Sequence, residues 1–523
     1  MKSSDKFLRG AMILTIAGLL VKVIGSVNRI LLSRLLGGEG IGLYQMAYPV
    51  YLLLLSISAA GIPVAISIIV AEYLAQRDYP NVRQVFRVSL RLMAVVGLVL
   101  AAALVMAAGW LVENGVIKDA RAYYALLALT PAIFFATILA SFRGYFQGHQ
   151  LMTPPAVSQI VEQFIRVVTM VVLAYVLLPY GLEFAAAGAA FGAVPGSLTG
   201  LVVLGGFYRY YKKQWRDEEY ALPGAQLTPA CRLIKRLLLL ALPVSCANVI
   251  VPVTSSIDVL LVPKYLLAAG FSVKEATTQF GYLAGMAQPL LLMATIPTMS
   301  LATSLVPAVS EAMALKRWPL IEEKLATAMK LCCLITVPAA VGMSALAGPI
   351  SRLLYGTGEA AAAIMHSGPA IWFLGLQQVT TGMLQGMGHT NLPMLHMLAG
   401  IVAKLIAVCQ LTNAEYGIAG AAWATNINLG VTAALNILAL QYFKIKFHWL
   451  SICKIIFAAL IMGAAAQALH GLLAGFNYTL ATLAALAGAG VVYAALLPLL
   501  RIISVAELKQ LPLVKKLAQK LRK

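Results

Sequence analysis

Charged residues, and acidic residues above all, are scarce in this sequence of 523 residues. Asp, Glu, Lys and Arg together make up 11% of it, whereas soluble domains carry roughly 25%. Hydrophobic residues make up 61%, which is more apolar sequence than the core of a soluble protein requires. The composition therefore excludes an ordinary soluble protein and predicts a polytopic membrane protein.

Cysteine is also rare, and the signatures of metal and nucleotide sites are missing. The six cysteines form no Cys-x-x-Cys pair and show no metal-ligand spacing, so we interpret them as structural residues. There is no Walker A motif, which argues against ATP as the direct energy source, and no pair of acids has a plausible catalytic spacing. We therefore expect a transporter rather than an enzyme, without cofactor or metal. Coupling to Na⁺, H⁺ or the membrane potential is left open.

Long apolar runs are what the sequence has in abundance. About fourteen stretches of roughly twenty residues could cross a bilayer as helices, and none alternates like a strand of a membrane barrel. The start of the chain resembles a signal peptide, but no small-residue cleavage site follows, so we interpret it as a retained first span. The expected spans are 10–33, 44–70, 85–109, 122–142, 155–178, 184–208, 234–262, 279–308, 328–350, 365–387, 392–412, 417–441, 451–473 and 478–503.

Basic residues outnumber acidic ones by 39 to 19, which gives a net charge of +20. If the N-terminus lies in the cytoplasm, 28 of the basic residues fall on the cytoplasmic side and 6 on the opposite side. This asymmetry predicts that both termini are cytoplasmic, and it explains the net charge without a nucleic acid partner. The C-terminal residues 504–523 are either a basic amphipathic helix on the anionic lipids of the inner leaflet or a solvated tail.

Two segments of the sequence resemble each other. GYFQGHQLMTPPAVSQIVEQFIR (144–166) and GMLQGMGHTNLPMLHMLAGIVAK (382–404) both begin with Gly-x-x-Gln-Gly, continue through a turn that contains proline, and end on a cation. Because about six spans separate them, the copies share one orientation, which predicts two parallel six-helix lobes around a central cavity plus two C-terminal helices. The expected domains are 1–208 (N-lobe), 209–233 (cytoplasmic loop), 234–441 (C-lobe), 442–503 (spans thirteen and fourteen) and 504–523 (basic tail).

The first expected span carries cations in an unusual place. Lys22, Ser26 and Arg29 share one face of a helix, and no acid lies on that face. A charge near the bilayer centre costs about 2.5–3.5 kcal/mol, so an aligned polar stripe indicates a water-filled cavity. A cationic cavity suits an anion, and phosphate best, because Lys and Arg both bind phosphate oxygens.

Later spans contribute further candidate residues. Glu162 and Arg166 have the i,i+4 spacing and order that favour an ion pair within a helix, either as a structural pair or as part of the substrate site. Asp258 either neutralises Lys404 or has a role of its own. We expect His396 to be a hydrogen-bonded packing residue.

Two stretches carry a resemblance to a known family. GEGIGLYQMAYPVYLLLLSISAAGIPVAISIIVAEY (38–73) and FRGYFQGHQLMTPPAVSQIVEQFIRV (142–167) resemble the polysaccharide-transporter branch of the multidrug/oligosaccharidyl-lipid/polysaccharide (MOP) superfamily. Within that branch, the chain is most similar to the stage V sporulation protein B group of Gram-positive bacteria. The resemblance covers essentially the whole chain, and the A-G-I-P-x-A-I-S and R-G-x-x-Q-G-x-x-x-M-x-P stretches are fairly specific to the group.

The resemblance implies a flippase for undecaprenyl-pyrophosphate-linked cell-wall precursors, with lipid II as the leading candidate. It implies that Lys22, Arg29 and Arg34 line the cavity, with Asn28 where relatives often have a cation. Arg34 could equally be an anchor at the membrane interface. It also places Asp258 where some relatives bind sodium, although the eleventh span offers Lys404 and no acid.

We therefore expect a monomeric protein of the bacterial cytoplasmic membrane whose partner is a lipid-linked oligosaccharide diphosphate, with a role in peptidoglycan biosynthesis or sporulation. Two other functions are left open. One is a cation-coupled multidrug exporter of the same superfamily, which would need an acidic cavity. The other is a scaffold in cell-wall or spore-coat assembly that does not transport.

Overall fold

The structure is a computed structural model, and it describes residues 2–59, 61–215, 227–443, 449–475 and 477–502. Helices account for all regular structure in these ranges, without a strand, so the predicted all-α fold is confirmed. The basic tail expected at 504–523, and part of the loop expected at 209–233, lie outside the described residues.

The lengths and compositions of the described helices fit a multi-pass membrane protein. Eleven helices are long and apolar enough to cross a bilayer, or twelve if the bent pair Val273–Ala294 and Ile296–Ala314 forms one span. Two further expected spans have helical counterparts in the structure. α1 (Lys2–Ser58) covers the first expected span and much of the second, and α14 (Ala361–Gly386) coincides with the tenth. The total of fourteen stays a prediction.

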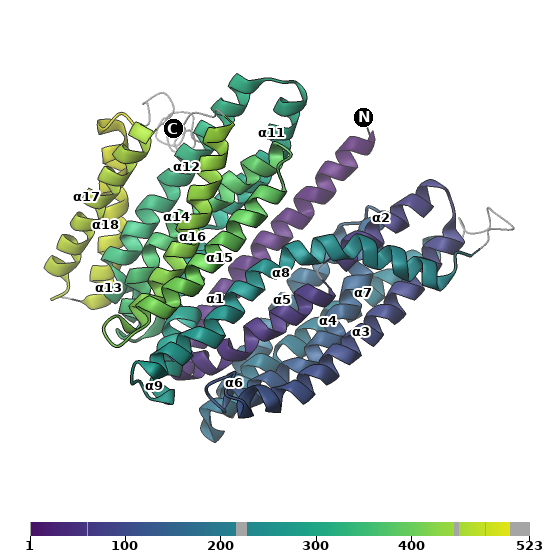
Figure 1. Cartoon of the computed structure of the whole chain (residues 1–523), viewed down its shortest axis with the longest axis horizontal. Helices are drawn as coiled ribbons and strands as arrows, with labels where there is room; N and C mark the ends of the chain where they lie inside the picture. The colour runs from purple at the N-terminus through teal and green to yellow at the C-terminus, as the bar shows by residue number, and fades with distance from the viewer. Residues whose placement is uncertain (1, 60, 216–226, 444–448, 476, 503–523) are drawn as a thin grey trace, which may run out of the picture. The chain divides into compact units, whose positions relative to one another are not determined.

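The chain divides into two compact units, Met1–Met286 and Ala287–Lys523, which we call unit 1 and unit 2. Unit 1 holds α1, α2 (Ile62–Ala75), α3 (Tyr79–Glu113), α4 (Ala122–Gly148), α5 (Thr153–Leu177), α6 (Leu182–Phe191), α7 (Ala193–Trp215), α8 (Ala230–Ala268) and α9 (Val273–Phe280). Unit 2 holds α10 (Gln288–Ala294), α11 (Ile296–Ala314), α12 (Trp318–Ala345), α13 (Ala347–Tyr355), α14, α15 (Asn391–Leu411), α16 (Gly417–Tyr442), α17 (Trp449–Leu473) and α18 (Tyr478–Leu499). Within unit 1, α5 packs against α1 and α7, and α3 packs against α4 (Figure 1). The lobe boundaries expected from the sequence stay predictions.

Gly37 breaks α1 into two helices. Its backbone angles are φ 66 and ψ −173, in the left-handed region that glycine adopts without steric cost. The break brings the Cζ atom of Arg29 to 5.8 Å from the ring centroid of Tyr48. A straight helix would separate these two residues by about 28 Å, at 1.5 Å per residue. The chain therefore reverses direction at Gly37, as two successive spans require.

The internal repeat recurs in the packing of the two units. Gly144 of α4 lies so close to α2 that an added Cβ would be 2.7 Å from the carbonyl oxygen of Pro63. Gly382 of α14 lies in the same way against α11, with an added Cβ 2.7 Å from the carbonyl oxygen of Ala302. The first glycine of each Gly-x-x-Gln-Gly segment thus lets a neighbouring helix approach its backbone.

The turn that follows Gly-x-x-Gln-Gly within each repeated segment also has the same backbone hydrogen bond. The amide of Gln150 donates to the carbonyl of Gln147 at 2.9 Å, and the amide of Gly388 donates to the carbonyl of Gln385 at 3.0 Å. Both donor residues have positive φ, at 57 for Gln150 and 89 for Gly388. The two segments therefore share one local structure, which supports the interpretation of an internal repeat.

Replacing Gly37 by alanine should destabilise the protein. A side chain at a positive φ costs about 1–2 kcal/mol, because Cβ approaches the following carbonyl oxygen. We expect Gly37→Ala to lower the melting temperature of the protein in detergent, measured by thermal unfolding. Gly109 of α3 is the matched control, because it is helical and an added Cβ would have no atom within 4 Å. Gly109→Ala should leave the melting temperature unchanged or raise it, and an equal loss in both variants would contradict the prediction.

Candidate functional site

A polar cluster lies where α1, α4 and α5 pack together in unit 1. Arg166 donates from Nη2 to Oε1 of Glu162 at 2.9 Å, and Arg143 donates from Nη2 to Oε2 of the same carboxylate at 2.6 Å. The i,i+4 ion pair expected between Glu162 and Arg166 is therefore confirmed. The three side chains are only 13–21% exposed. Two arginines share one carboxylate, so the trio keeps one positive charge.

Arg29 and three tyrosines of α1 lie beside this trio. Tyr44, Tyr48 and Tyr51 follow one another on one helix face, with ring centroids 5.3 and 5.8 Å apart. Arg29 lies over the ring of Tyr48 at a cation–π distance of 5.8 Å. Arg166 lies within electrostatic range of all three tyrosines. The tyrosines thus connect the two arginines into one cluster with an excess of positive charge.

The first half of α1 exposes two different faces within unit 1. Lys22 is exposed, and Ser26 and Arg29 are half-buried, on the polar face that the sequence predicts. The opposite face is apolar, and its side chains are 43–48% exposed: Leu20, Val23, Val27 and Leu31. A helix of this kind can separate lipid on one side from water on the other.

The structure does not bring Arg34 and Asn28 together with Lys22 and Arg29. Arg34 is exposed and continues the apolar face of α1. It lines a groove of about 520 Å³ whose other side chains are Leu31, Leu35, Val171, Val172 and Tyr175. Asn28 is buried and donates from Nδ2 to the sulfur of Met170 at 3.3 Å. Arg34 therefore fits the alternative of an interfacial anchor, and Asn28 packs against α5.

The candidates from later spans are distributed over both units. Asp258 is buried on α8 in unit 1, and Lys404 is buried on α15 in unit 2, so the ion pair between them stays a prediction. His396 of α15 lies with Nδ1 2.7 Å from Oδ1 of Asn436, which confirms its expected role as a hydrogen-bonded packing residue. Asn436 in turn donates to the hydroxyl of Thr380 at 3.1 Å.

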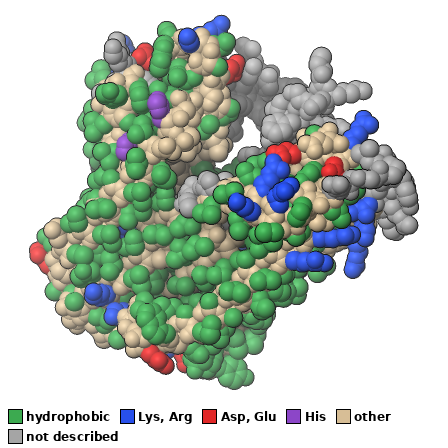
Figure 2. Space-filling view, turned by 45° about the vertical axis from the view of Figure 1, so that its right-hand side comes forward, with side chains coloured by type: hydrophobic (Ala, Val, Ile, Leu, Met, Phe, Trp, Pro, Cys, Tyr) green, Lys and Arg blue, Asp and Glu red, His purple; other side chains and the backbone are tan. Residues whose placement is uncertain are grey.

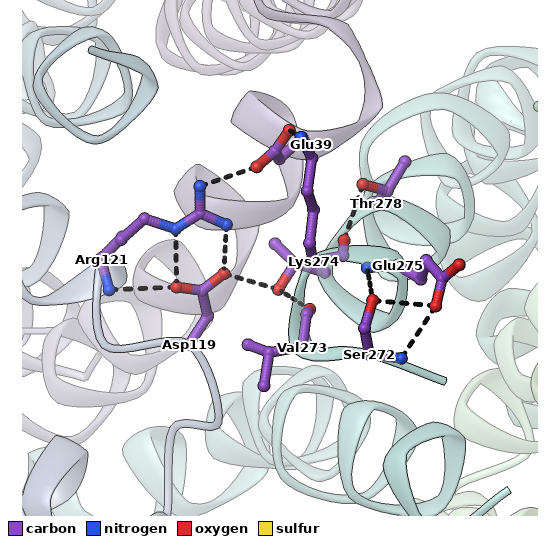
Figure 3. A network of polar contacts seen from close by, with 9 residues as sticks. Glu39, Asp119, Arg121, Ser272, Val273, Lys274, Glu275 and Thr278 are labelled. Carbon is purple, nitrogen blue, oxygen red and sulfur yellow. Dashed lines mark hydrogen bonds and ion pairs between the residues drawn. The ribbon is translucent and has the colours of Figure 1, made fainter. Parts of the chain in front are cut away.

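A second polar network lies at the turn that follows the first span (Figure 3). Glu39 accepts a hydrogen bond from Nη1 of Arg121 at 2.7 Å and lies 3.5 Å from Nζ of Lys274. Arg121 also donates to both carboxylate oxygens of Asp119, at 3.0 and 2.8 Å, and the hydroxyl of Thr277 donates to Asp119 at 2.8 Å. These bonds connect α1, the α3–α4 loop and α9 within unit 1.

Glycine residues bring the backbones together beside this network. An added Cβ at Gly281 would overlap the carbonyl oxygen of Gly38, and an added Cβ at Gly42 would overlap the carbonyl oxygen of Thr277. The glycines of the GEGIG stretch (38–42) therefore allow α1 to contact the last turn of α9 and the π-helical turn that follows it. This contact explains in physical terms part of the motif that carries the family resemblance.

Asp119 is kept ionised by its hydrogen-bond donors. Although burial opposes the charge, hydrogen bonds from Arg121 and Thr277 lower the pKa of Asp119 below its ordinary value of 3.8. A carboxylate with a lowered pKa stabilises the folded state above its unfolded pKa, and this contribution is lost as pH falls through the folded pKa. The network should therefore persist at mildly acidic pH and fail only in strong acid.

Asp119→Asn should lower the melting temperature at pH 7, because Arg121 loses a charged partner. The difference from the wild type should shrink as pH falls below 3.8, because Asp119 of the unfolded wild-type chain then binds a proton that the folded state takes up only at lower pH. Thermal unfolding in detergent across this pH range measures both effects. Glu113→Gln removes an exposed acid at the end of α3 and is the control, which should change little. A difference between Asp119→Asn and the wild type that stayed constant with pH would contradict the prediction.

Arg143 and Tyr48 are absent from the site residues expected from the sequence. For Arg143 a signal exists, because only residues 149–152 separate α4 from α5. This tight connection places the last turns of α4 near the early turns of α5, within reach of a long arginine side chain. The contact of Tyr48 depends on how the chain reverses between the first two expected spans, because spacing along a single helix does not bring Arg29 and Tyr48 together.

Comparisons with known proteins agree with this architecture. Residues 7–313 match the family described as "Polysaccharide biosynthesis protein", and residues 283–408 match the MatE family. Over 521 residues, the chain is 32% identical to "Stage V sporulation protein B" of Bacillus subtilis (strain 168). This match covers 98% of this chain and 99% of the relative. It is 27% identical over 424 residues to "Lipid II flippase MurJ" of the same organism, with 77% of each chain covered.

Solved structures share the fold at low sequence identity. A structure of "Lipid II flippase MurJ, inward closed conformation" has a TM-score of 0.70 at 15% identity and covers 93% of this chain and 98% of its own. A structure of an inward-facing multidrug resistance MATE family transporter of the MOP superfamily has a TM-score of 0.65 at 16% identity. The match covers 80% of this chain and 94% of that chain. The first family match spans more than half of the chain, and the sporulation relative matches nearly all of it. The chain therefore belongs to the "Polysaccharide biosynthesis protein" family and is a multi-pass membrane transporter of the MOP superfamily, not an enzyme.

Proposed function

We propose that the protein is a flippase that moves an undecaprenyl-pyrophosphate-linked cell-wall oligosaccharide precursor across the bacterial cytoplasmic membrane by alternating access. Lipid II is the leading candidate for this substrate. The proposal depends on one observation about unit 1. The polar face of α1 and the adjoining cluster contain the cations Lys22, Arg29, Arg143 and Arg166 and a single paired carboxylate, Glu162.

This excess of positive charge suits a diphosphate. Arginine and lysine bind phosphate oxygens through charge-assisted hydrogen bonds, which strengthen where water is scarce. Arg29 lies over an aromatic ring, so its N–H groups stay available at the ring edge for an anion. Glu162 would serve as an internal counter-ion that lowers the cost of Arg143 and Arg166 in the membrane. An incoming diphosphate could then compete with Glu162 for the same guanidinium groups.

The relatives support the class of substrate. One of them is named for flipping lipid II, and another is named for sporulation, so both growth and sporulation roles are compatible with the proposal. We further propose that both termini lie in the cytoplasm, that the protein acts as a monomer, and that Lys404 also binds the substrate. Asp258 would be the group that responds to a coupling ion.

A cation-coupled multidrug exporter is the second candidate, because residues 283–408 match the MatE family. Such an exporter would need carboxylates where its cationic substrates bind. The polar cluster of unit 1 instead carries more cations than carboxylates. Dye efflux that Asp258→Asn abolishes would favour the exporter over the flippase.

The double variant Lys22→Ala/Arg29→Ala should lose precursor translocation. Each lost charge-assisted contact is worth about 1.5–3 kcal/mol, so the loss of two contacts should reduce translocation by at least about 100-fold. Lipid II accessibility at the cell surface measures the effect in bacteria whose own lipid II flippase can be depleted. Abundance in the membrane, measured on the same cells, separates loss of function from loss of protein.

Arg34→Ala is the matched control for the double variant. It removes a cation from the same helix, but from the apolar face rather than the polar one. We expect it to retain most of the translocation activity. Unchanged translocation in Lys22→Ala/Arg29→Ala, or an equal loss in Arg34→Ala, would overturn the assignment of the polar face as the substrate site.

A further inference from the structure

α3 presents one continuous exposed face in unit 1. The face begins with Arg87 and Arg91, which are exposed, and continues through side chains that are 50–75% exposed: Val95, Leu98, Val99, Val105, Met106 and Trp110. None of the described elements of unit 1 covers these side chains. A stripe of aliphatic side chains that is bounded by arginines at one end and tryptophan at the other is typical of a helix that faces lipid.

The length of this stripe matches a bilayer. Arg91 and Trp110 are separated by about 28 Å at 1.5 Å per residue, and the hydrocarbon core of a bilayer is about 30 Å thick. When Trp110 lies at one interface, Arg91 lies at the other, and Arg87 lies one turn further toward the headgroups. The α3 arginines are therefore placed at the depth of the lipid phosphates.

An aromatic platform fixes the arginine end of α3. The ring of Phe86 packs at 5.0 Å from the rings of both Phe142 of α4 and Tyr208 of α7. Tyr208 also lies within electrostatic range of Arg83 and Arg87. The ring contacts hold the start of α3 against α4 and α7.

The acids near this end of unit 1 have other partners. Glu72 of α2 forms an ion pair with Arg236 of α8, and Asp78 caps the first turn of α3. In the part of the chain that the structure describes, no carboxylate forms an ion pair with Arg87 or Arg91. Figure 2 shows Lys and Arg side chains gathered beside a broad hydrophobic surface, the combination that an anionic lipid complements.

We propose that Arg87 and Arg91 of α3, together with the hydroxyl of Tyr208, bind the phosphate of an anionic phospholipid of the surrounding bilayer. The acyl chains would lie along the aliphatic stripe from Val95 to Met106. This site is separate from the polar cluster of α1, α4 and α5, and the lipid is a bound component of the membrane rather than the transported substrate.

The experiment uses the full-length protein in nanodiscs of phosphatidylcholine with increasing amounts of phosphatidylglycerol. Native mass spectrometry then counts the lipids that remain bound. We expect the wild type to retain phosphatidylglycerol in preference to phosphatidylcholine. Arg87→Gln/Arg91→Gln should weaken this retention by about 25-fold, from about 1 kcal/mol for each basic residue near an anionic surface.

Lys316→Gln is the matched control, because Lys316 is an exposed cation of unit 2, in the connection between α11 and α12. It should retain phosphatidylglycerol as the wild type does. The melting temperature in pure phosphatidylcholine discs should be equal for all three proteins, which excludes misfolding as the cause.

Three outcomes would overturn the proposal. The first is equal retention of phosphatidylglycerol by Arg87→Gln/Arg91→Gln and the wild type. The second is an equal loss in Lys316→Gln, which would indicate only a general attraction between a basic protein and an anionic membrane. The third is displacement of phosphatidylglycerol by millimolar inorganic phosphate, which would indicate a site for free phosphate rather than for a lipid.

Discussion

The structure of unit 1 depends on how charge is kept inside a membrane. Isolated charges are costly in a medium of low dielectric constant, and pairs of charges remain costly unless their hydrogen bonds are satisfied. Glu162 meets this requirement by accepting from Arg143 and Arg166 at 2.6 and 2.9 Å. One carboxylate thus holds two guanidinium groups, and the remaining positive charge makes the cluster suitable for an anion.

The reversal at Gly37 gives this cluster its second component. Without it, the cation of the first span and the tyrosines of the second would lie on one straight helix, far apart. With it, Arg29 lies over Tyr48 and near the same tyrosines that surround Arg166. The network of Glu39, Arg121 and Asp119 lies directly after the reversal, so the turn is held by ion pairs as well as by backbone conformation.

The sequence was sufficient for the features that depend on periodicity. The all-α fold, the polar face of Lys22 and Arg29, and the Glu162–Arg166 pair follow from spacing along a helix, and the structure has each of them. The expectations for Arg34 and Asn28 came from the family resemblance and not from spacing along a helix. Arg34 lies only five residues after Arg29, but five residues turn a helix by about 140°, which moves it to the apolar face. Asn28 is adjacent to Arg29 in sequence and yet faces α5.

The two repeats have kept their packing and changed their polar chemistry. Gly144 and Gly382 make equivalent close contacts, so the helix hairpins are built alike. At the positions that correspond to Glu162 and Arg166 of α5, α15 of unit 2 carries Gly400 and Lys404, so the repeat keeps the cation and loses the acid. One turn earlier, α15 carries His396, which is hydrogen-bonded to the amide of Asn436. Neutral amides and hydroxyls can form hydrogen bonds to sugar hydroxyls without the cost of burying a charge. Guanidinium groups, by contrast, match the geometry and charge of phosphates. Because Arg143 and Arg166 share a single carboxylate and keep an excess of positive charge, we propose that the diphosphate of the substrate binds to unit 1.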